Sequence, residues 1–70
     1  MSVTLTINGK KETLSLPNSP SLKDLLDFYQ IKKQNVIIEH NNTVYSQNNL
    51  INVGLRENDI IEILHYMGGG

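Results

Sequence analysis

Apolar residues alternate with threonines over residues 3–7, which is the period-two pattern of a β-strand with one buried face. Asn8-Gly9 comes next, and this pair favours the type I′ turn of a hairpin because both central residues need positive φ. Alternation resumes through Leu14 and Leu16, and the segment Pro17–Pro20 follows. Because proline cannot donate a hydrogen bond to a sheet, this segment ends the returning strand. The first part of the chain is therefore predicted to be a β-hairpin.

A short amphipathic helix is predicted after the hairpin. Ser21 is a favourable N-cap residue, and an aspartate stands three residues later in the first turn. Apolar side chains then recur at Leu22, Leu25, Leu26 and Tyr29. This i, i+3, i+4, i+7 spacing places all four on one helix face, which we expect to pack on a sheet.

Two further strands and an irregular connection are predicted in the second half of the chain. The β-branched segment Asn35–Glu39 indicates a strand, and Asn41-Asn42 favours a turn into a shorter strand at Thr43–Tyr45. Residues 46–55 show no regular period. We expect an irregular connection there that contains a brief helical turn.

The last strand is predicted after Asn58-Asp59 and is the most apolar segment, Ile60–Met67. The resulting order of strand, strand, helix, strand, short strand, strand is that of an α+β, β-grasp (ubiquitin-like) domain. It predicts a mixed sheet of four to five strands packed on one helix. The first and last strands are then expected to lie side by side and parallel at the centre, which accounts for the apolar character of the last.

Composition limits the classes of function. The chain has 70 residues, no cysteine and a net charge of -1, so disulfides, thiolate chemistry, a nucleic-acid footprint and a basic membrane patch are not expected. No segment has the length of a signal peptide core or a membrane span. We expect a soluble, cytoplasmic protein that is monomeric alone, with a domain at residues 1–67 and a flexible tail at residues 68–70.

The tail Gly68–Gly70 is the candidate functional segment. Glycine lacks a Cβ, so such a tail can lie extended in a channel too narrow for side chains and present its carboxylate to another protein's active site. The alternative is a terminal segment or linker without a role. The glycine tail is more typical of a protein that is the substrate of another enzyme than of an enzyme with its own active-site pocket.

Three stretches carry a resemblance to a known family: Ser21–Leu26, Val36–Asn41 and Asp59–Gly70. With the predicted order of elements, the whole chain resembles the ThiS family of sulfur carrier proteins in thiamine biosynthesis. The family commonly has Gly-Asp where this chain has Asn58-Asp59, and Asn-Gly where it has Asn41-Asn42. Asparagine tolerates left-handed backbone better than other non-glycine residues, so both departures preserve the turns.

The resemblance implies a protein co-substrate that binds no cofactor itself. A ThiF-type adenylyltransferase that uses ATP and Mg would adenylate the carboxylate of Gly70. A sulfur donor protein would then supply the sulfur for a terminal thiocarboxylate, and a ThiG-type thiazole synthase would receive it. Gly69 and Gly68 would let the tail thread into the activating site.

A partner-binding surface is also expected on the last strand. If Ile61 and Ile63 face the core, the alternate residues face outward. The expected partner-binding residues are Ile37, Glu62, Leu64, Tyr66 and Met67.

Three other functions remain open: a molybdopterin-type sulfur carrier, a ubiquitin-like modifier conjugated through Gly70, and an interaction module with a tail of no function. No metal site is expected, because His40 and His65 stand far apart without clustered ligands. The remaining acids are interpreted as a capped helix face for Asp24 and Asp27, and a solvated strand edge for residues 57–62.

Overall fold

The computed structural model of the chain describes residues 2–65. In chain order, the elements are β1 (Ser2–Ile7), β2 (Lys10–Ser15), α1 (Leu22–Tyr29), the 3₁₀ turn η1 (Lys33–Asn35), β3 (Val36–His40), β4 (Thr43–Tyr45), the 3₁₀ turn η2 (Gln47–Asn52) and β5 (Ile60–His65). The predicted order of strands and helix is confirmed. The brief helical turn expected in the irregular connection is η2.

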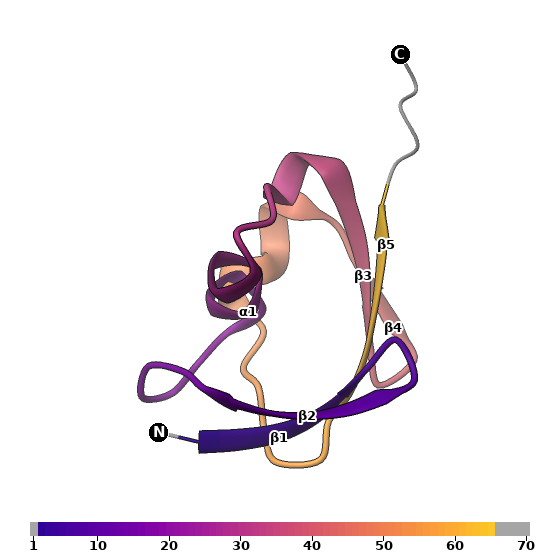
Figure 1. Cartoon of the computed structure of the whole chain (residues 1–70). Coiled ribbons are helices and arrows are strands. Elements are labelled where there is room, and N and C mark those ends of the chain that lie inside the picture. Colours follow the sequence, from indigo (N-terminus) through magenta and orange to yellow (C-terminus); the bar gives the residue numbers. More distant parts are fainter. Residues whose placement is uncertain (1, 66–70) are drawn as a thin grey trace.

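The strands form one mixed sheet in the order β2-β1-β5-β3-β4. β1 and β5 are parallel, with Thr6 opposite Ile60 and Ile7 opposite Ile61. The other pairs are antiparallel. Figure 1 shows the sheet curving around α1, with β5 running beside β3. The β-grasp prediction is correct, including the central, parallel position of the last strand.

The core lies between the sheet and α1. The helix begins with a capping box, in which the Ser21 hydroxyl accepts from the Asp24 amide and the Asp24 carboxylate accepts from the Ser21 amide. The alternating face of the sheet and the apolar face of the helix supply the buried side chains: Val3, Leu5, Ile7, Leu14, Leu16, Leu22, Leu25, Leu26, Val36, Ile38, Leu50, Leu55, Ile61 and Ile63. Tyr29 lies on the predicted helix face, where it lines a cavity with Ile7 and Ile63, but it remains 37% exposed at the last turn of α1.

Asparagines form the turns that connect the strands. Asn8 and Gly9 have φ of 51° and 82°, as the hairpin prediction requires. Asn41, Asn42 and Asn58 are also left-handed, with φ of 47°, 75° and 69°. Asparagine therefore occupies positions where a residue with a bulkier side chain would be strained.

Candidate functional site

β5 is the element that leads into the candidate tail. Ile61 is fully buried and Ile63 is 6% exposed, and the strand pairs with β1 on one side and β3 on the other. Five of the predicted site residues, Tyr66, Met67, Gly68, Gly69 and Gly70, lie outside the described residues. The described part of the site is therefore the strand that carries them, together with its surroundings.

The start of β5 is fixed by a buried carboxylate. Asp59 is 8% exposed, and its Oδ2 accepts from His40 Nε2 at 2.8 Å and from the Arg56 amide at 2.8 Å. Its Oδ1 accepts from Asn41 Nδ2 at 3.1 Å. The prediction of a solvated strand edge is thus wrong for Asp59, because this carboxylate ties the turn before β5 to the turn between β3 and β4.

Two opposing effects act on the Asp59 carboxyl. Burial would raise its pKa, but hydrogen bonds from Asn41, His40 and the Arg56 amide, and the charge of His40 when protonated, outweigh burial and hold the pKa below 3.8. An ionised carboxylate only accepts hydrogen bonds, so His40 Nε2 donates to it. Asp59 therefore remains ionised at neutral pH and stabilises the start of the strand.

The opposite side of β5 from the core carries an apolar surface, here called the outer patch. Its residues lie on three neighbouring strands: Ile60, Leu64, Ile37 and Val44. Leu64 is 53% exposed and stands directly opposite the half-buried Ile37. The structure thus brings together two of the predicted partner-binding residues, and it adds Ile60 and Val44, which are 56% and 64% exposed.

Two acids lie within the outer patch. Glu62 is exposed, as the alternation predicts, and it stands directly opposite Glu39 on β3. Like charges in opposite positions on neighbouring strands destabilise a sheet. The outer patch therefore combines apolar surface with two neighbouring carboxylates.

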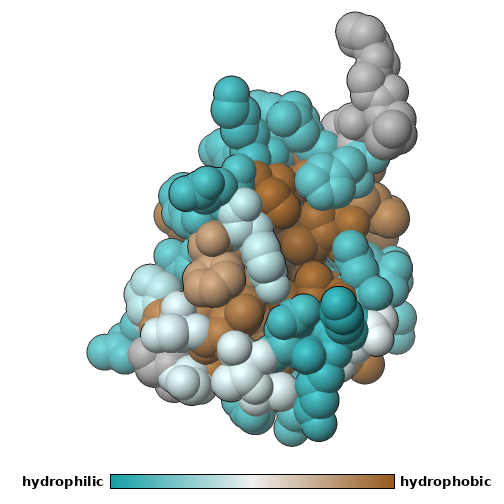
Figure 2. All heavy atoms as spheres, viewed as in Figure 1, coloured by the Kyte–Doolittle hydropathy of each residue, from teal (hydrophilic) through white to brown (hydrophobic). Residues whose placement is uncertain are grey.

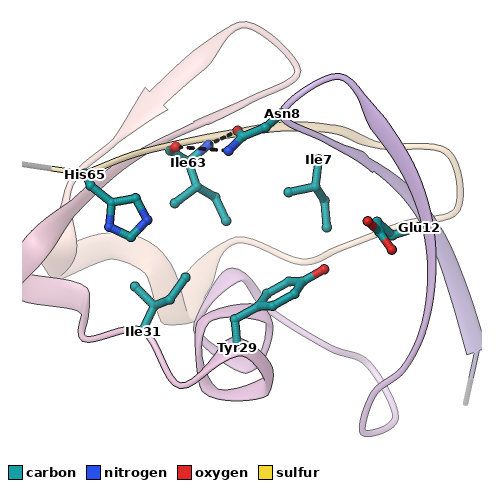
Figure 3. A pocket seen from close by; sticks show the side chains of 7 residues that line it. All are labelled: Ile7, Asn8, Glu12, Tyr29, Ile31, Ile63 and His65. Atoms are coloured by element: carbon teal, nitrogen blue, oxygen red, sulfur yellow. Dashed lines mark hydrogen bonds between the residues drawn. The ribbon is translucent and has the colours of Figure 1, made fainter.

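A cavity of about 220 Å³ lies on the other face, between α1 and the end of β5. Figure 2 shows apolar atoms in this opening, surrounded by polar side chains. Figure 3 shows the residues that line it: Ile7, Asn8, Glu12, Tyr29, Ile31, Ile63 and His65. Partial burial, and then the charge of Glu12, raise the pKa of Tyr29. The phenol of Tyr29 therefore stays neutral at physiological pH and forms a polar part of the cavity wall.

The remaining candidate side chains have structural explanations. Asp24 caps α1, and Asp27 accepts from Lys23 at 2.9 Å on the helix surface. Glu57 accepts from the Thr4 amide at 3.0 Å. Within residues 2–65, no group of three ligand-type side chains is placed to hold a metal ion. No helix of the described part is long and apolar enough to cross a membrane.

Comparison with known proteins gives consistent matches along the chain. The model of the ThiS family matches residues 3–70. The sulfur carrier protein ThiS of Bacillus subtilis (strain 168) is 35% identical over 66 residues, which cover 94% of this chain and 98% of that protein.

Solved structures give the same result. The crystal structure of the thiamine biosynthesis protein ThiS from Geobacter metallireducens superposes with a TM-score of 0.80 at 29% identity, covering 97% of this chain and all of that one. A solution structure of a thiamine biosynthesis protein from the same organism gives a TM-score of 0.79 and covers 97% of this chain and 88% of that one.

Proposed function

The chain belongs to the ThiS family, and from this premise we propose that it carries sulfur on its C-terminal carboxylate for thiazole formation in thiamine biosynthesis. The observation that supports the proposal most strongly is the extent of the family match. It covers residues 3–70 and so includes the fold and the three terminal glycines. In this reading the chain is a co-substrate, and the catalytic groups belong to its partners.

The proposed chemistry has two steps at Gly70. A carboxylate oxygen attacks the α-phosphorus of ATP, and pyrophosphate leaves, so that the carboxylate becomes an acyl adenylate. A hydrosulfide equivalent from a sulfur donor protein then attacks the carbonyl carbon. The new C–S bond forms as the C–O bond to AMP breaks, and the product is a thiocarboxylate. Activation is needed because a free carboxylate has no good leaving group.

Each partner is assigned one of these reactions or the step that follows them. A ThiF-type adenylyltransferase, with ATP and Mg, performs the activation, and a ThiG-type thiazole synthase takes the sulfur from the thiocarboxylate. Gly69 and Gly68 serve as the narrow segment that enters each active site, because a Cβ at these positions would widen the chain.

The outer patch is proposed as the docking surface for these partners. Leu64 on β5 is exposed and Ile37 on β3 is half-buried, and the two provide neighbouring apolar surface. Exposed apolar side chains that lie side by side, as Leu64 and Ile37 do, are typical of interaction sites when polar residues border them. The Glu39 and Glu62 pair favours a partner that offers a basic side chain, because such a group would offset the repulsion between the two carboxylates. Tyr66 and Met67 are proposed to extend this surface.

A carrier with a blocked C-terminus tests the proposed chemistry. Exchange of labelled pyrophosphate into ATP by a ThiF-type enzyme is measured with the chain ending at Gly70 and with the same chain extended by one alanine. We expect exchange only with the chain that ends at Gly70, because the extended chain presents its carboxylate on a residue that carries a Cβ. Equal exchange with both chains, or no exchange with a competent enzyme, would contradict the proposal.

Acceptors distinguish sulfur transfer from protein modification. A thiocarboxylate loses its sulfur to thiazole synthase and leaves the carrier unattached. A modifier instead forms an isopeptide bond to a lysine, which gives a larger species that resists reductants. Such adducts, without sulfur transfer, would favour the modifier.

A further inference from the structure

Asn8 extends the pairing of β5 beyond the point where β1 ends. β1 pairs with β5 in a parallel register, and the Thr6 amide donates to the Asp59 carbonyl at 2.9 Å. The next bond of the same ladder runs from the Asn8 amide to the Ile61 carbonyl, also at 2.9 Å. In a regular parallel ladder, the Asn8 carbonyl would then accept from the Ile63 amide.

The backbone of Asn8 does not continue as a strand. Its φ is 51°, and the chain turns there into the hairpin with β2. The side chain replaces the lost backbone groups instead. Asn8 Oδ1 accepts from the Ile63 amide at 2.7 Å, and Asn8 Nδ2 donates to the Ile63 carbonyl at 3.4 Å. Figure 3 shows both bonds, with the carboxamide lying beside the backbone of Ile63.

A carboxamide offers the same donor and acceptor as a peptide group. Asn8 therefore satisfies both backbone groups that Ile63 turns toward β1, in the place where that strand is missing. The opposite side of β5 is held by β3, with Leu64 opposite Ile37 and His65 opposite Val36. The strand is thus hydrogen-bonded on both sides up to Ile63, two residues before the end of the strand.

We propose that Asn8 is a positioning residue for the tail, which fixes the direction in which the chain leaves β5 toward a partner's active site. The inference rests on the proposed function, since it concerns how the carboxylate of Gly70 is delivered. A strand end held on both sides restricts the directions available to the residues that follow. Less conformational freedom is then lost when the tail enters a narrow channel.

The position of Asn8, outside the tail itself, predicts which kinetic constant its loss should change. Asn8 is exposed and lies at a turn, so its side chain contributes little to the core. Loss of the carboxamide should free the last residues of β5 without unfolding the domain. Once the tail is bound, the partner itself holds the reacting carboxylate. Hence the KM for the carrier should rise while kcat remains the same.

Asn8→Gly is the sharpest variant, because glycine adopts a φ of 51° without strain while it removes both side-chain bonds. Asn42→Gly is the matched control. Asn42 is also an exposed turn asparagine with positive φ, 75°, and within residues 2–65 its side chain forms no hydrogen bond to β5. Asn8→Asp serves as the second variant, since it keeps an acceptor for the Ile63 amide but loses the donor.

Two measurements on the full chain test the inference. In amide hydrogen exchange, the Ile63 amide should exchange about fivefold or more faster in Asn8→Gly than in Asn42→Gly, while the Leu5 and Ile38 amides keep their protection. In adenylation by a ThiF-type enzyme, Asn8→Gly should raise KM about three- to tenfold at unchanged kcat. Asn42→Gly should match wild type, and Asn8→Asp should give intermediate values.

An unchanged exchange rate of the Ile63 amide in Asn8→Gly would show that the Asn8 side chain does not hold β5. Faster exchange with an unchanged KM, or a fall in kcat alone, would overturn its positioning role. Should Asn8→Gly fail to fold, Asn8→Asp decides the same two questions. Failure of the proposed function is distinguishable, because wild-type carrier would then not be adenylated at all. The positioning role of Asn8 would then be refuted together with the proposed function. The exchange rate of the Ile63 amide would still show whether Asn8 holds β5.

Discussion

Replacing Asp59 by alanine should destabilise the fold by about 3 kcal/mol. The carboxylate accepts from His40 Nε2, Asn41 Nδ2 and the Arg56 amide at 2.8, 3.1 and 2.8 Å. The His40 side chain is only 14% exposed, so the loss of its partner should cost about 2 kcal/mol. The Asn41 carboxamide and the Arg56 amide donate in part-buried hydrogen bonds, and the loss of each bond should add about 0.5 kcal/mol.

This loss is large for a small domain. Natural domains are stabilised by roughly 0.05–0.15 kcal/mol per residue, which gives about 4–10 kcal/mol for this chain of 70 residues. Removal of the Asp59 carboxylate should therefore take away about a third or more of the free energy of unfolding. The effect should arise at the start of β5, where the carboxylate joins two turns.

Urea unfolding followed by far-ultraviolet circular dichroism measures the change. Asp27→Asn is the control, because the Asp27 side chain is 60% exposed and pairs with Lys23 four residues away. Such an exposed surface pair contributes little to stability, because water screens it. The reasoning is refuted if Asp59→Ala unfolds with a free energy within about 0.5 kcal/mol of that of Asp27→Asn.

Three further predictions concern pH, docking and the tail. Because the pKa of Asp59 is lowered, its contribution to stability is present above the ordinary pKa of 3.8 and is lost as pH falls through the lower pKa of the folded state. Between about pH 6 and pH 3, the free energy of unfolding in urea should therefore fall more in wild type than in Asp59→Asn. An equal fall in both proteins would contradict this. Leu64→Ser should weaken binding to a ThiF-type enzyme about five- to thirtyfold, as measured by titration calorimetry. Ile51→Ser, at a position on η2 that is 64% exposed against 53% for Leu64, should bind like wild type. Equal affinities of the Leu64→Ser variant and wild type would exclude docking through Leu64. Gly69→Ala and Gly70→Ala should leave the unfolding curve nearly unchanged but reduce adenylation, and equal adenylation rates would remove the steric argument for the glycines.

Sequence pattern was sufficient for the fold because its signals are local. The alternation over residues 3–7, the Asn8-Gly9 pair and the spacing from Leu22 to Leu26 each act within one element or turn. Each element therefore had a single predicted face toward the core, and burial of Leu5, Leu25 and Ile61 follows that expectation. Tyr29 keeps the same face but stays 37% exposed, because it lies in the last turn of α1.

The polar side chains that hold β5 through hydrogen bonds could not be predicted in the same way. His40 and Asp59 are 19 positions apart, and Asn8 and Ile63 are 55 apart. Their contacts depend on the register between β3 and β5 and on where β1 ends, which alternation does not specify. A signal was present in Asn58-Asp59, since an acid directly before a buried strand and after a left-handed residue is placed to accept backbone hydrogen bonds.

The outer patch could be predicted from the sequence only in part. Alternation correctly placed Glu62 and Leu64 on the exposed side of β5. The contribution of Val44 required the pairing of β4 with β3, and the opposition of Glu39 to Glu62 required the register of β3 with β5. Cross-strand neighbours are the part of a sheet surface that a single strand's pattern leaves open.

Intact-protein mass spectrometry tests the central claim most directly. The chain ending at Gly70 is incubated with ATP, Mg, a ThiF-type enzyme and a sulfur donor, and the same reaction without ATP serves as the control. The account predicts a mass gain equal to replacement of one oxygen by sulfur, located on the last glycine by fragmentation. An unchanged mass, with an enzyme shown to be competent on its own carrier, would contradict the account.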